Sequence, residues 1–257
     1  MKFDFSTKFY PAQAFRVGDV LELSIRGVTV AFRYSPPGRF LMGQSDGERS
    51  DYVCVPQREV RLTCGIWLLE TPVTQGLWKA VTGSNPSYFQ GADARPAENV
   101  SWNACRKFIR ELNKIGIAPR GLTFDFPTEA EWERACRAGT TTAYNFGDVI
   151  TENDANYARH IEETTPVKSY EPNAWGFYDM HGNVSEWVFD ASISFQPLPE
   201  LDPVAKRGDH RVVRGGDWTQ DERRCESSFR SNFNVCYSDS NIGFRLALRN
   251  SRPNASR

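Results

Sequence analysis

The stretch RGGDWTQDERRCESSFRSNFNVCYSDSNIGFRLAL, residues 214–248, combines two kinds of sequence. Its ends carry the motifs Gly215-Gly216 and Gly243-Phe244-Arg245, which are typical of a fixed scaffold. Its middle, residues 219–240, scatters aromatic and apolar side chains among serines and asparagines, with neither a helical nor a strand period. Recognition residues usually lie on loops that a rigid scaffold holds. The middle of this stretch therefore predicts an exposed binding surface.

The composition around this stretch is that of a globular protein with balanced charge. Of the 257 residues, 40% are hydrophobic and 13% are aromatic, which is enough for a substantial core. The 31 basic residues nearly cancel the 32 acidic ones, so no overall field would attract nucleic acid or an acidic membrane. No apolar run approaches the roughly 18 residues of a membrane span. We therefore expect neither a nucleic-acid partner nor a direct membrane span.

The order of local signals along the chain is strands, then helices, then loops. Seven tryptophans spread along the chain predict that one core joins both halves, so we expect a single domain over residues 1–250 and a disordered tail at 251–257. The expected elements are a hairpin within 17–34, strands within 55–69, and helices near 74–83, 101–115 and 126–139, with Ser101 as a helix N-cap and a capping box at Thr128 and Glu131.

Eight motifs occur in order along the chain: FLMG (40–43), ETPVTQGLW (70–78), NPSYF (85–89), PAENVSWNAC (96–105), FPTEAEWERACRAG (126–139), NAWGFYDMHGNVSEW (173–187), VVRGGDW (212–218) and NIGFRLA (241–247). Together they resemble one known family, the formylglycine-generating enzyme or sulfatase-modifying factor domain. The resemblance covers residues 27–249 and leaves 1–26 as an N-terminal strand extension. It implies an α+β class, the elaborated C-type-lectin-like fold, with two to three helices, twisted antiparallel strands and much irregular loop.

The same resemblance argues against the family's oxidase chemistry in this chain. The family's enzymes use two thiolates that bind copper(I), five residues apart, shortly after the Arg-Gly-Gly motif. Cys225 matches the second thiolate, but Gln220 occupies the position of the first. An amide is a poor copper(I) ligand and has no thiol redox chemistry. We expect no copper and no catalysis, with a copper-dependent formylglycine-generating oxidase as the alternative.

A calcium site of the family does have matching residues here. By resemblance it would use Asp179, the carbonyl oxygens of Gly182 and Val184, and the Glu186 carboxylate. Hard oxygen ligands of this kind suit Ca²⁺. We therefore expect a structural calcium ion, with the alternative that the two carboxylates only accept hydrogen bonds from loop amides.

Residues 214–248 most resemble the variable proteins of this fold, which retroelements diversify at asparagine codons. This resemblance predicts a non-catalytic protein that binds a protein or a surface glycan, and a place at the cell surface or elsewhere outside the cytoplasm. For Phe229 or Phe233 taken singly, a core role is an equal alternative, and a purely structural or accessory domain is a third hypothesis for the whole chain. The predicted ligand-binding residues are Thr219, Gln220, Ser228, Phe229, Ser231, Asn232, Phe233, Val235, Cys236, Tyr237, Ser238 and Ser240.

Overall fold

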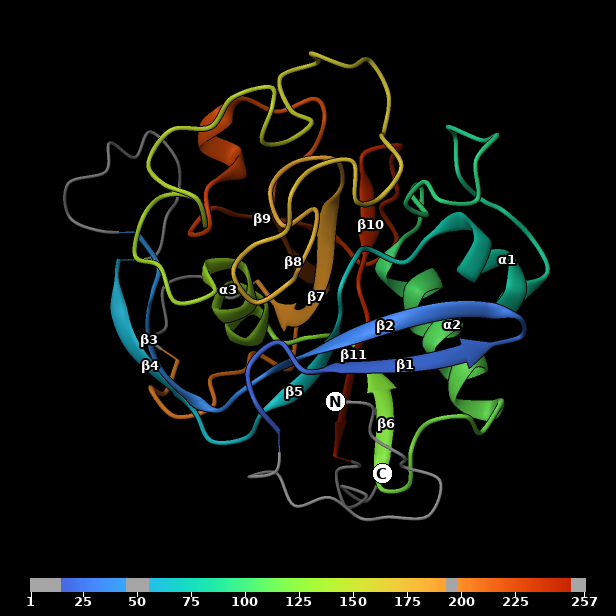
Figure 1. Ribbon diagram of the computed structural model, residues 1–257, viewed down its shortest axis with the longest axis horizontal. Coiled ribbons are helices and arrows are strands. Elements are labelled where there is room, and N and C mark those ends of the chain that lie inside the picture. Colours follow the sequence, from blue (N-terminus) through green and yellow to red (C-terminus); the bar gives the residue numbers. More distant parts are fainter. Residues whose placement is uncertain (1–14, 45–55, 193–197, 251–257) are drawn as a thin grey trace.

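Three helices lie against curled, mostly antiparallel sheets, so the class is α+β as predicted (Figure 1). The computed structural model describes residues 15–44, 56–192 and 198–250. The predicted tail at 251–257 and most of the predicted N-terminal extension lie outside the described residues. No helix in the described ranges has the length and apolar character that crossing a bilayer requires.

The strands form three sheets. One has the order β1-β2-β5-β11-β6, the second β10-β7-β8-β9, and the third pairs β3 with β4. The first sheet comprises β1 (Val20–Ile25), β2 (Val28–Ser35), β5 (Ile66–Leu69), β11 (Ala247–Asn250) and β6 (Leu122–Asp125). The others comprise β10 (Ile242–Phe244), β7 (Ser185–Ala191), β8 (His210–Arg214), β9 (Arg230–Asn234), β3 (Gly38–Met42) and β4 (Arg58–Leu62).

The predicted N-terminal hairpin is confirmed. Strands β1 and β2 pair antiparallel, with Ile25 opposite Val28, so the turn contains only Arg26 and Gly27. Both turn residues have positive φ, 48° and 87°. A two-residue turn with positive φ at both positions matches the right-handed twist of the flanking strands.

The predicted helix starts are confirmed by their caps. Helices α1 (Gln75–Thr82), α2 (Trp102–Lys114) and α3 (Glu129–Arg137) begin after Thr74, Ser101 and Thr128, whose side chains accept the expected backbone hydrogen bonds. Thr128 and Glu131 form the predicted capping box. The end of α3 differs from the prediction, because Ala138, one residue before Gly139, adopts the left-handed conformation with φ 48°.

The main core lies between the first sheet and helices α1 and α2, and it also includes side chains of β7, β8 and β10. Trp187 of β7 is fully buried, and its Nε1 donates to the carbonyl of Val100, 2.9 Å away. Trp102 of α2 makes the reciprocal contact, donating to the carbonyl of Val188 at 3.0 Å. These paired bonds fasten the four-stranded sheet to the start of α2.

The middle of residues 214–248 is more regular than its composition predicts. It contains the short 3₁₀ helix η2 (Glu222–Cys225) and the strand β9, which pairs with β8 from Arg230 opposite Arg214 to Asn234 opposite His210. Strand β9 is an edge strand. An edge strand has solvent on one side and needs no strict apolar alternation, so its sequence gives only a weak strand pattern.

Candidate functional site

The Gly215-Gly216 motif allows residues 214–225 to pack closely. Both glycines have positive φ, 93° and 67°. A Cβ atom on Gly216 would lie 2.5 Å from the carbonyl oxygen of Arg224 and 2.7 Å from the Cys225 sulfur. Only glycine fits there, because any side chain would overlap the chain that returns through η2.

Cys225, which matches the family's second active-site thiol, is fully buried. Burial raises the pKa of its thiol well above the ordinary value, and nearby Asp217 and Asp221 raise it further. The carbonyl of Cys225 lies 2.7 Å from Nδ1 of His181. Burial lowers the pKa of His181 to about 4, so the ring is neutral and donates from Nδ1 to this carbonyl. The thiol is therefore held protonated and out of reach of solvent.

Gln220 occupies the position of the family's first thiol. Its backbone is fixed on both sides, because its N–H donates to Asp217 and its carbonyl accepts from Ala158 at 2.7 Å. The side-chain Oε1 is buried and has no hydrogen-bond partner among the described residues. A neutral amide oxygen is therefore buried at the position that the family resemblance assigns to the first thiol.

Two predicted ligand-binding residues are wrong: Ser228 and Phe229 are buried, with exposed fractions of 3% and 7%. The cause is Arg214, whose guanidinium binds the carbonyls of Ser227 and Ser228 at 2.8 Å and also that of Phe229. The same guanidinium pairs with Glu133 of α3, and both side chains are almost completely buried. This contact holds residues 227–229, the inner segment, against the core.

The later predicted residues lie at the surface or are half-buried. Phe233 is half-buried and packs edge-on to Trp187, while its outer face stacks on Tyr237 with ring centroids 4.6 Å apart. Tyr237 is 39% exposed. We refer to these residues as the 231–240 surface, which consists of Ser231, Asn232, Phe233, Val235, Cys236, Tyr237, Ser238 and Ser240.

The backbone of the 231–240 surface is hydrogen-bonded to the first turn of α2 and to the segment before it. The N–H of Asn103 donates to the carbonyl of Val235 at 3.1 Å, and that of Asn99 donates to Asp239 at 2.8 Å. The remaining predicted residue, Thr219, is half-buried and donates its hydroxyl to Asp217 at 2.6 Å. The 231–240 surface is therefore a loop and an edge strand held by backbone hydrogen bonds, whereas Thr219 is bonded to Asp217 and is not part of this surface.

An aromatic residue beside this surface was missed by the sequence reasoning. Tyr88 is 72% exposed, and its neighbour Phe89 packs edge-on against Trp218 at 5.4 Å. Trp218 in turn donates to the carbonyl of Ser240 at 3.4 Å, which connects the two regions. The motif NPSYF contained the signal, but only the long-range contact through Trp218 relates it to residue 240.

Glu98 holds the loop that carries Tyr88 and Phe89 by a hydrogen bond. Its side chain is fully buried, and Oε1 accepts a hydrogen bond from the N–H of Phe89 at 2.9 Å. Burial raises the pKa of Glu98 to about 7, and Asp239 adds to the shift while Arg95 opposes it. Its ionisation near neutral pH therefore bears directly on the loop that carries Tyr88.

One of the predicted calcium ligands, the Glu186 carboxylate, already has protein partners. The Glu186 carboxylate is bound by Arg245, with Nη2 to Oε1 at 2.6 Å and Nε to Oε2 at 2.8 Å, and by Nε1 of Trp132 at 2.7 Å. Asp179 accepts from the N–H of Lys168, and burial raises its pKa to about 6. The other two predicted ligands lie in the same segment, where Gly182 has a positive φ of 73° and Val184 is 1% exposed.

Two other oxygens would suit a hard cation better than Glu186 does. Asn156 Oδ1 and Thr165 Oγ1 are buried without hydrogen-bond partners in the described ranges. Both residues contact Asn183, through Asn183 N to the Asn156 carbonyl at 2.8 Å and Thr165 N to Asn183 Oδ1 at 2.9 Å. No cluster of three histidine, cysteine or carboxylate side chains suited to a metal occurs in the described parts of the chain. Calcium binding stays a prediction, without Glu186 among the ligands.

Comparison with known proteins identifies the family to which this fold and its motifs belong. Residues 31–250 match the sulfatase-modifying factor enzyme 1-like domain. The formylglycine-generating enzyme of Streptomyces coelicolor is 32% identical over 192 residues, which are 66% of this chain and 57% of that enzyme. The serine/threonine-protein kinase pkn1 of Chlamydia caviae is 40% identical over 233 residues, 82% of this chain. The chain spans only 36% of that kinase's length.

Two solved structures share the fold over most of the chain. Treponema denticola variable protein 1 superposes with a TM-score of 0.77 at 28% identity, covering 88% of this chain and 97% of that protein. PvdO from Pseudomonas aeruginosa superposes with a TM-score of 0.80 at 25% identity, covering 91% of this chain and 99% of that protein. Relatives with enzymatic names and a relative named as a variable protein therefore share one scaffold.

Proposed function

The chain belongs to the sulfatase-modifying factor domain family, and from that premise we propose that it is a non-catalytic, ligand-binding member. The observation that carries the proposal is the pair Gln220 and Cys225. One is an amide in the place of a thiol, and the other is a fully buried thiol whose pKa lies well above its ordinary value. The reactive species of cysteine is the thiolate, so neither position supplies one.

The proposed ligand site is the 231–240 surface together with Tyr88. Phe233 and Tyr237 form a stacked pair with one exposed edge, and Asn232 and Ser238 lie exposed beside them. Aromatic side chains bring a large contact area at low entropic cost, and asparagine and serine bring adaptable hydrogen bonds. The likeness to Treponema denticola variable protein 1 supports this use of the fold.

The ligand is a protein or a surface glycan, because both offer the apolar faces and hydroxyl or amide groups that such a surface binds. Stacked aromatic rings suit the apolar face of a sugar as well as a hydrophobic side chain. The acidic group on this surface, Asp239, is bonded by the Tyr237 hydroxyl at 2.9 Å. The eight residues that define the 231–240 surface are uncharged, and Asp239 adds a single carboxylate beside them, so we expect binding to depend weakly on salt.

Binding can be measured with the fluorescently labelled protein on a glycan array and on an array of immobilised surface proteins. We expect specific capture on one of them, and loss of that capture in the double variant Phe233→Ala and Tyr237→Ala. The variant Val149→Ala serves as the matched control, because Val149 is an apolar residue that is 75% exposed and belongs to a different loop. Equal capture by the double variant would overturn the assignment of the site.

The oxidase alternative has its own decisive assay. The protein is incubated with a Cys-x-Pro-x-Arg peptide, copper and oxygen, and the peptide mass is followed. We expect the cysteine to remain unchanged, because Gln220 and the protonated Cys225 cannot together hold copper(I). Formation of an aldehyde product would contradict the non-catalytic assignment directly.

A further inference from the structure

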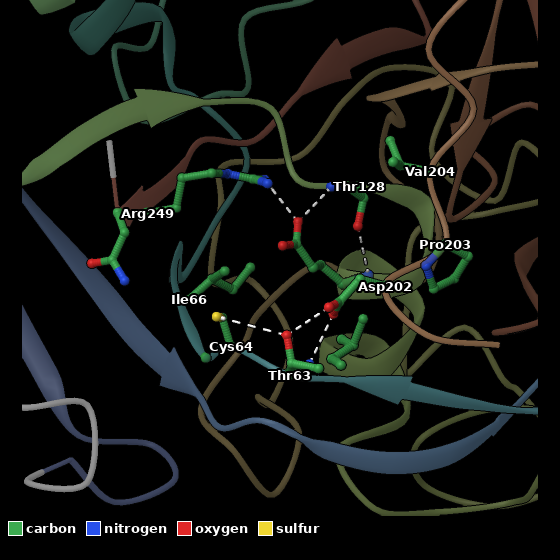
Figure 2. Close-up of a pocket in the computed structure, with 12 residues that line it drawn as sticks. Thr63, Cys64, Ile66, Thr128, Asp202, Pro203, Val204 and Arg249 are labelled. Carbon is green, nitrogen blue, oxygen red and sulfur yellow. Dashed lines mark hydrogen bonds and ion pairs between the residues drawn. The ribbon is translucent and has the colours of Figure 1, made fainter. Parts of the chain in front are cut away.

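A cavity of about 320 Å³ is formed by elements that carry none of the 231–240 surface (Figure 2). It lies where the end of β4, the start of β5, the first turn of α3 and the end of β11 meet. The segment Asp202–Val204 closes the remaining side. The proposed function does not use this cavity.

The walls of the cavity combine apolar surface with two carboxylates. Leu62 and Ile66 are almost fully buried and line the apolar part together with Val204. Figure 2 shows Arg249 and Thr128 on one side of the cavity and Thr63 with Asp202 on the opposite side. The shape therefore offers an apolar pocket between two polar walls.

The polar walls are fixed by hydrogen bonds. Oε2 of Glu131 accepts from the N–H of Thr128 and from Nη2 of Arg249, both at 2.7 Å. Across the cavity, Oδ1 and Oδ2 of Asp202 accept from the N–H and the hydroxyl of Thr63 at 2.8 and 2.5 Å. These contacts hold both carboxylates in place, which is the preorganisation that a recognition site requires.

The charges of the lining do not balance. Arg249 neutralises Glu131, whereas Asp202 is bonded by the neutral Thr63, so these three charged groups leave one net negative charge. The lining therefore has one unneutralised carboxylate, Asp202, next to the apolar surface of Leu62 and Ile66, and a ligand with a cation beside an apolar group would complement both.

We propose that this cavity binds the amino terminus of a peptide whose first residue is apolar. The α-ammonium group lies between Asp202 and Glu131, where charge-assisted hydrogen bonds are strongest. The first side chain packs on Leu62 and Ile66. Capture of a chain terminus by fixed polar groups is a known mode of peptide recognition.

Calorimetric titration with three small probes tests the required chemistry. Leucinamide has the ammonium, the carbonyl and an apolar side chain, and we expect it to bind. N-acetyl-leucinamide lacks the ammonium, and we expect no measurable binding. The tripeptide Leu-Gly-Gly extends the chain, and we expect it to bind like leucinamide. Failure of leucinamide, or equal binding of the acetylated probe, overturns the proposal, and binding of leucinamide without Leu-Gly-Gly overturns the assignment to a peptide.

The variant Asp202→Asn removes the charge but keeps an oxygen that can accept from the N–H of Thr63. We expect it to weaken leucinamide binding about tenfold, because a hydrogen bond to a charged group is lost. A thermal melt like that of the unchanged protein establishes that the fold is intact. Unchanged affinity in a folded Asp202→Asn variant contradicts the proposal.

The exposed thiol of Cys64 lines the cavity, so its rate of alkylation reports whether a ligand occupies the cavity. We expect leucinamide to slow alkylation of Cys64 by iodoacetamide, measured on the Cys64 peptide by mass spectrometry. The exposed thiol of Cys236 belongs to the 231–240 surface and is the matched control, with an unchanged rate. Equal slowing at both thiols, or none at Cys64, counts against occupancy of this cavity.

Discussion

The inner segment, residues 227–229, and the 231–240 surface have similar sequences but opposite environments. Both contain phenylalanine and serine, yet Phe229 is 7% exposed whereas Tyr237 is 39% exposed. The difference comes from Arg214, which gathers the inner carbonyls and pairs with Glu133. Among the described residues, no comparable buried cation binds the backbone of the 231–240 surface. Its backbone is held by pairing of β9 with β8, by the amides of Asn99 and Asn103, and by Nε1 of Trp218.

This contrast shows that composition alone does not separate a binding surface from the scaffold beneath it. A buried guanidinium that binds several carbonyl groups fixes a segment, because each carbonyl that leaves water needs a hydrogen-bond donor in place of the water it loses. The exposed segment has fewer such demands and can accept substitutions. The fold therefore divides one irregular stretch into a buried part and an exposed part.

The largest expected effect is that of Arg214→Met, which removes the link between the inner segment and α3. Glu133 would keep only Arg137 as an ionic partner, and the carbonyls of Ser227 and Ser228 would lose their donor. We expect a loss of about 3–5 kcal/mol in the free energy of unfolding, measured by urea denaturation. The surface pair of Arg39 and Glu59 gives the control, since Arg39→Ala should cost at most about 1 kcal/mol. Equal losses would remove the proposed cause of the contrast.

The next effect compares two phenylalanines four residues apart. Phe229→Ala should lower the free energy of unfolding by about 3 kcal/mol, because it empties a buried site. Phe233→Ala, at a half-buried site, should cost only about 1 kcal/mol. Both losses are measured by urea denaturation under the same conditions. A cost at Phe233 as large as that at Phe229 would place it in the core and weaken the case for the 231–240 surface.

A smaller effect concerns pH and the loop that carries Tyr88. The fold raises the pKa of Glu98 from 4.5 to about 7, so it favours the protonated form. The stability that this group contributes is present in full below its unfolded pKa and is lost as pH rises through about 7. Between about pH 5 and pH 8, the melting temperature of Glu98→Gln should fall less steeply with pH than that of the wild-type protein.

That pH experiment must be read as a difference between proteins. Burial also raises the pKa of Asp179 to about 6 and that of Asp190 to about 7, so the unchanged protein has several contributions in the same range. Those contributions are common to both proteins and cancel on subtraction when the sites are independent. If the melting temperatures of the two proteins fall in parallel as pH rises, Glu98 does not titrate in this pH range.

The smallest expected effect on stability is that of Tyr237→Ala. Its ring stacks on Phe233 at the surface, and its hydroxyl bonds only to Asp239 two residues away. We expect the free energy of unfolding to change by at most about 0.5 kcal/mol. Ligand capture should nevertheless fall strongly, because exposed tyrosines are frequent binding anchors. A large loss of stability with intact capture would reverse this assignment.

Local signals in the sequence predicted the scaffold well. The N-caps at Thr74, Ser101 and Thr128 and the turn at Arg26 depend on residues within a few positions of one another. Their hydrogen bonds form within a single turn, so the order of residue types is sufficient to identify them. The motifs of the family then placed these elements in one fold.

The environment of the site could not be predicted in the same way. Phe229 is buried because Arg214 reaches Glu133, 81 positions earlier in the sequence, and Glu186 is occupied because Arg245 lies 59 positions later. The peptide-terminus cavity likewise combines Thr63, Glu131 and Asp202 from three distant segments. Contacts at such separations depend on the tertiary arrangement, which periodicity and composition do not report.

Hydrogen–deuterium exchange of the complex with the glycan or protein found on the arrays tests the central claim most directly. We predict that the ligand slows amide exchange in residues 231–240 and around Tyr88, with little change in the inner segment. Slowed exchange confined to other segments, with residues 231–240 unaffected, would contradict the assignment of the binding surface.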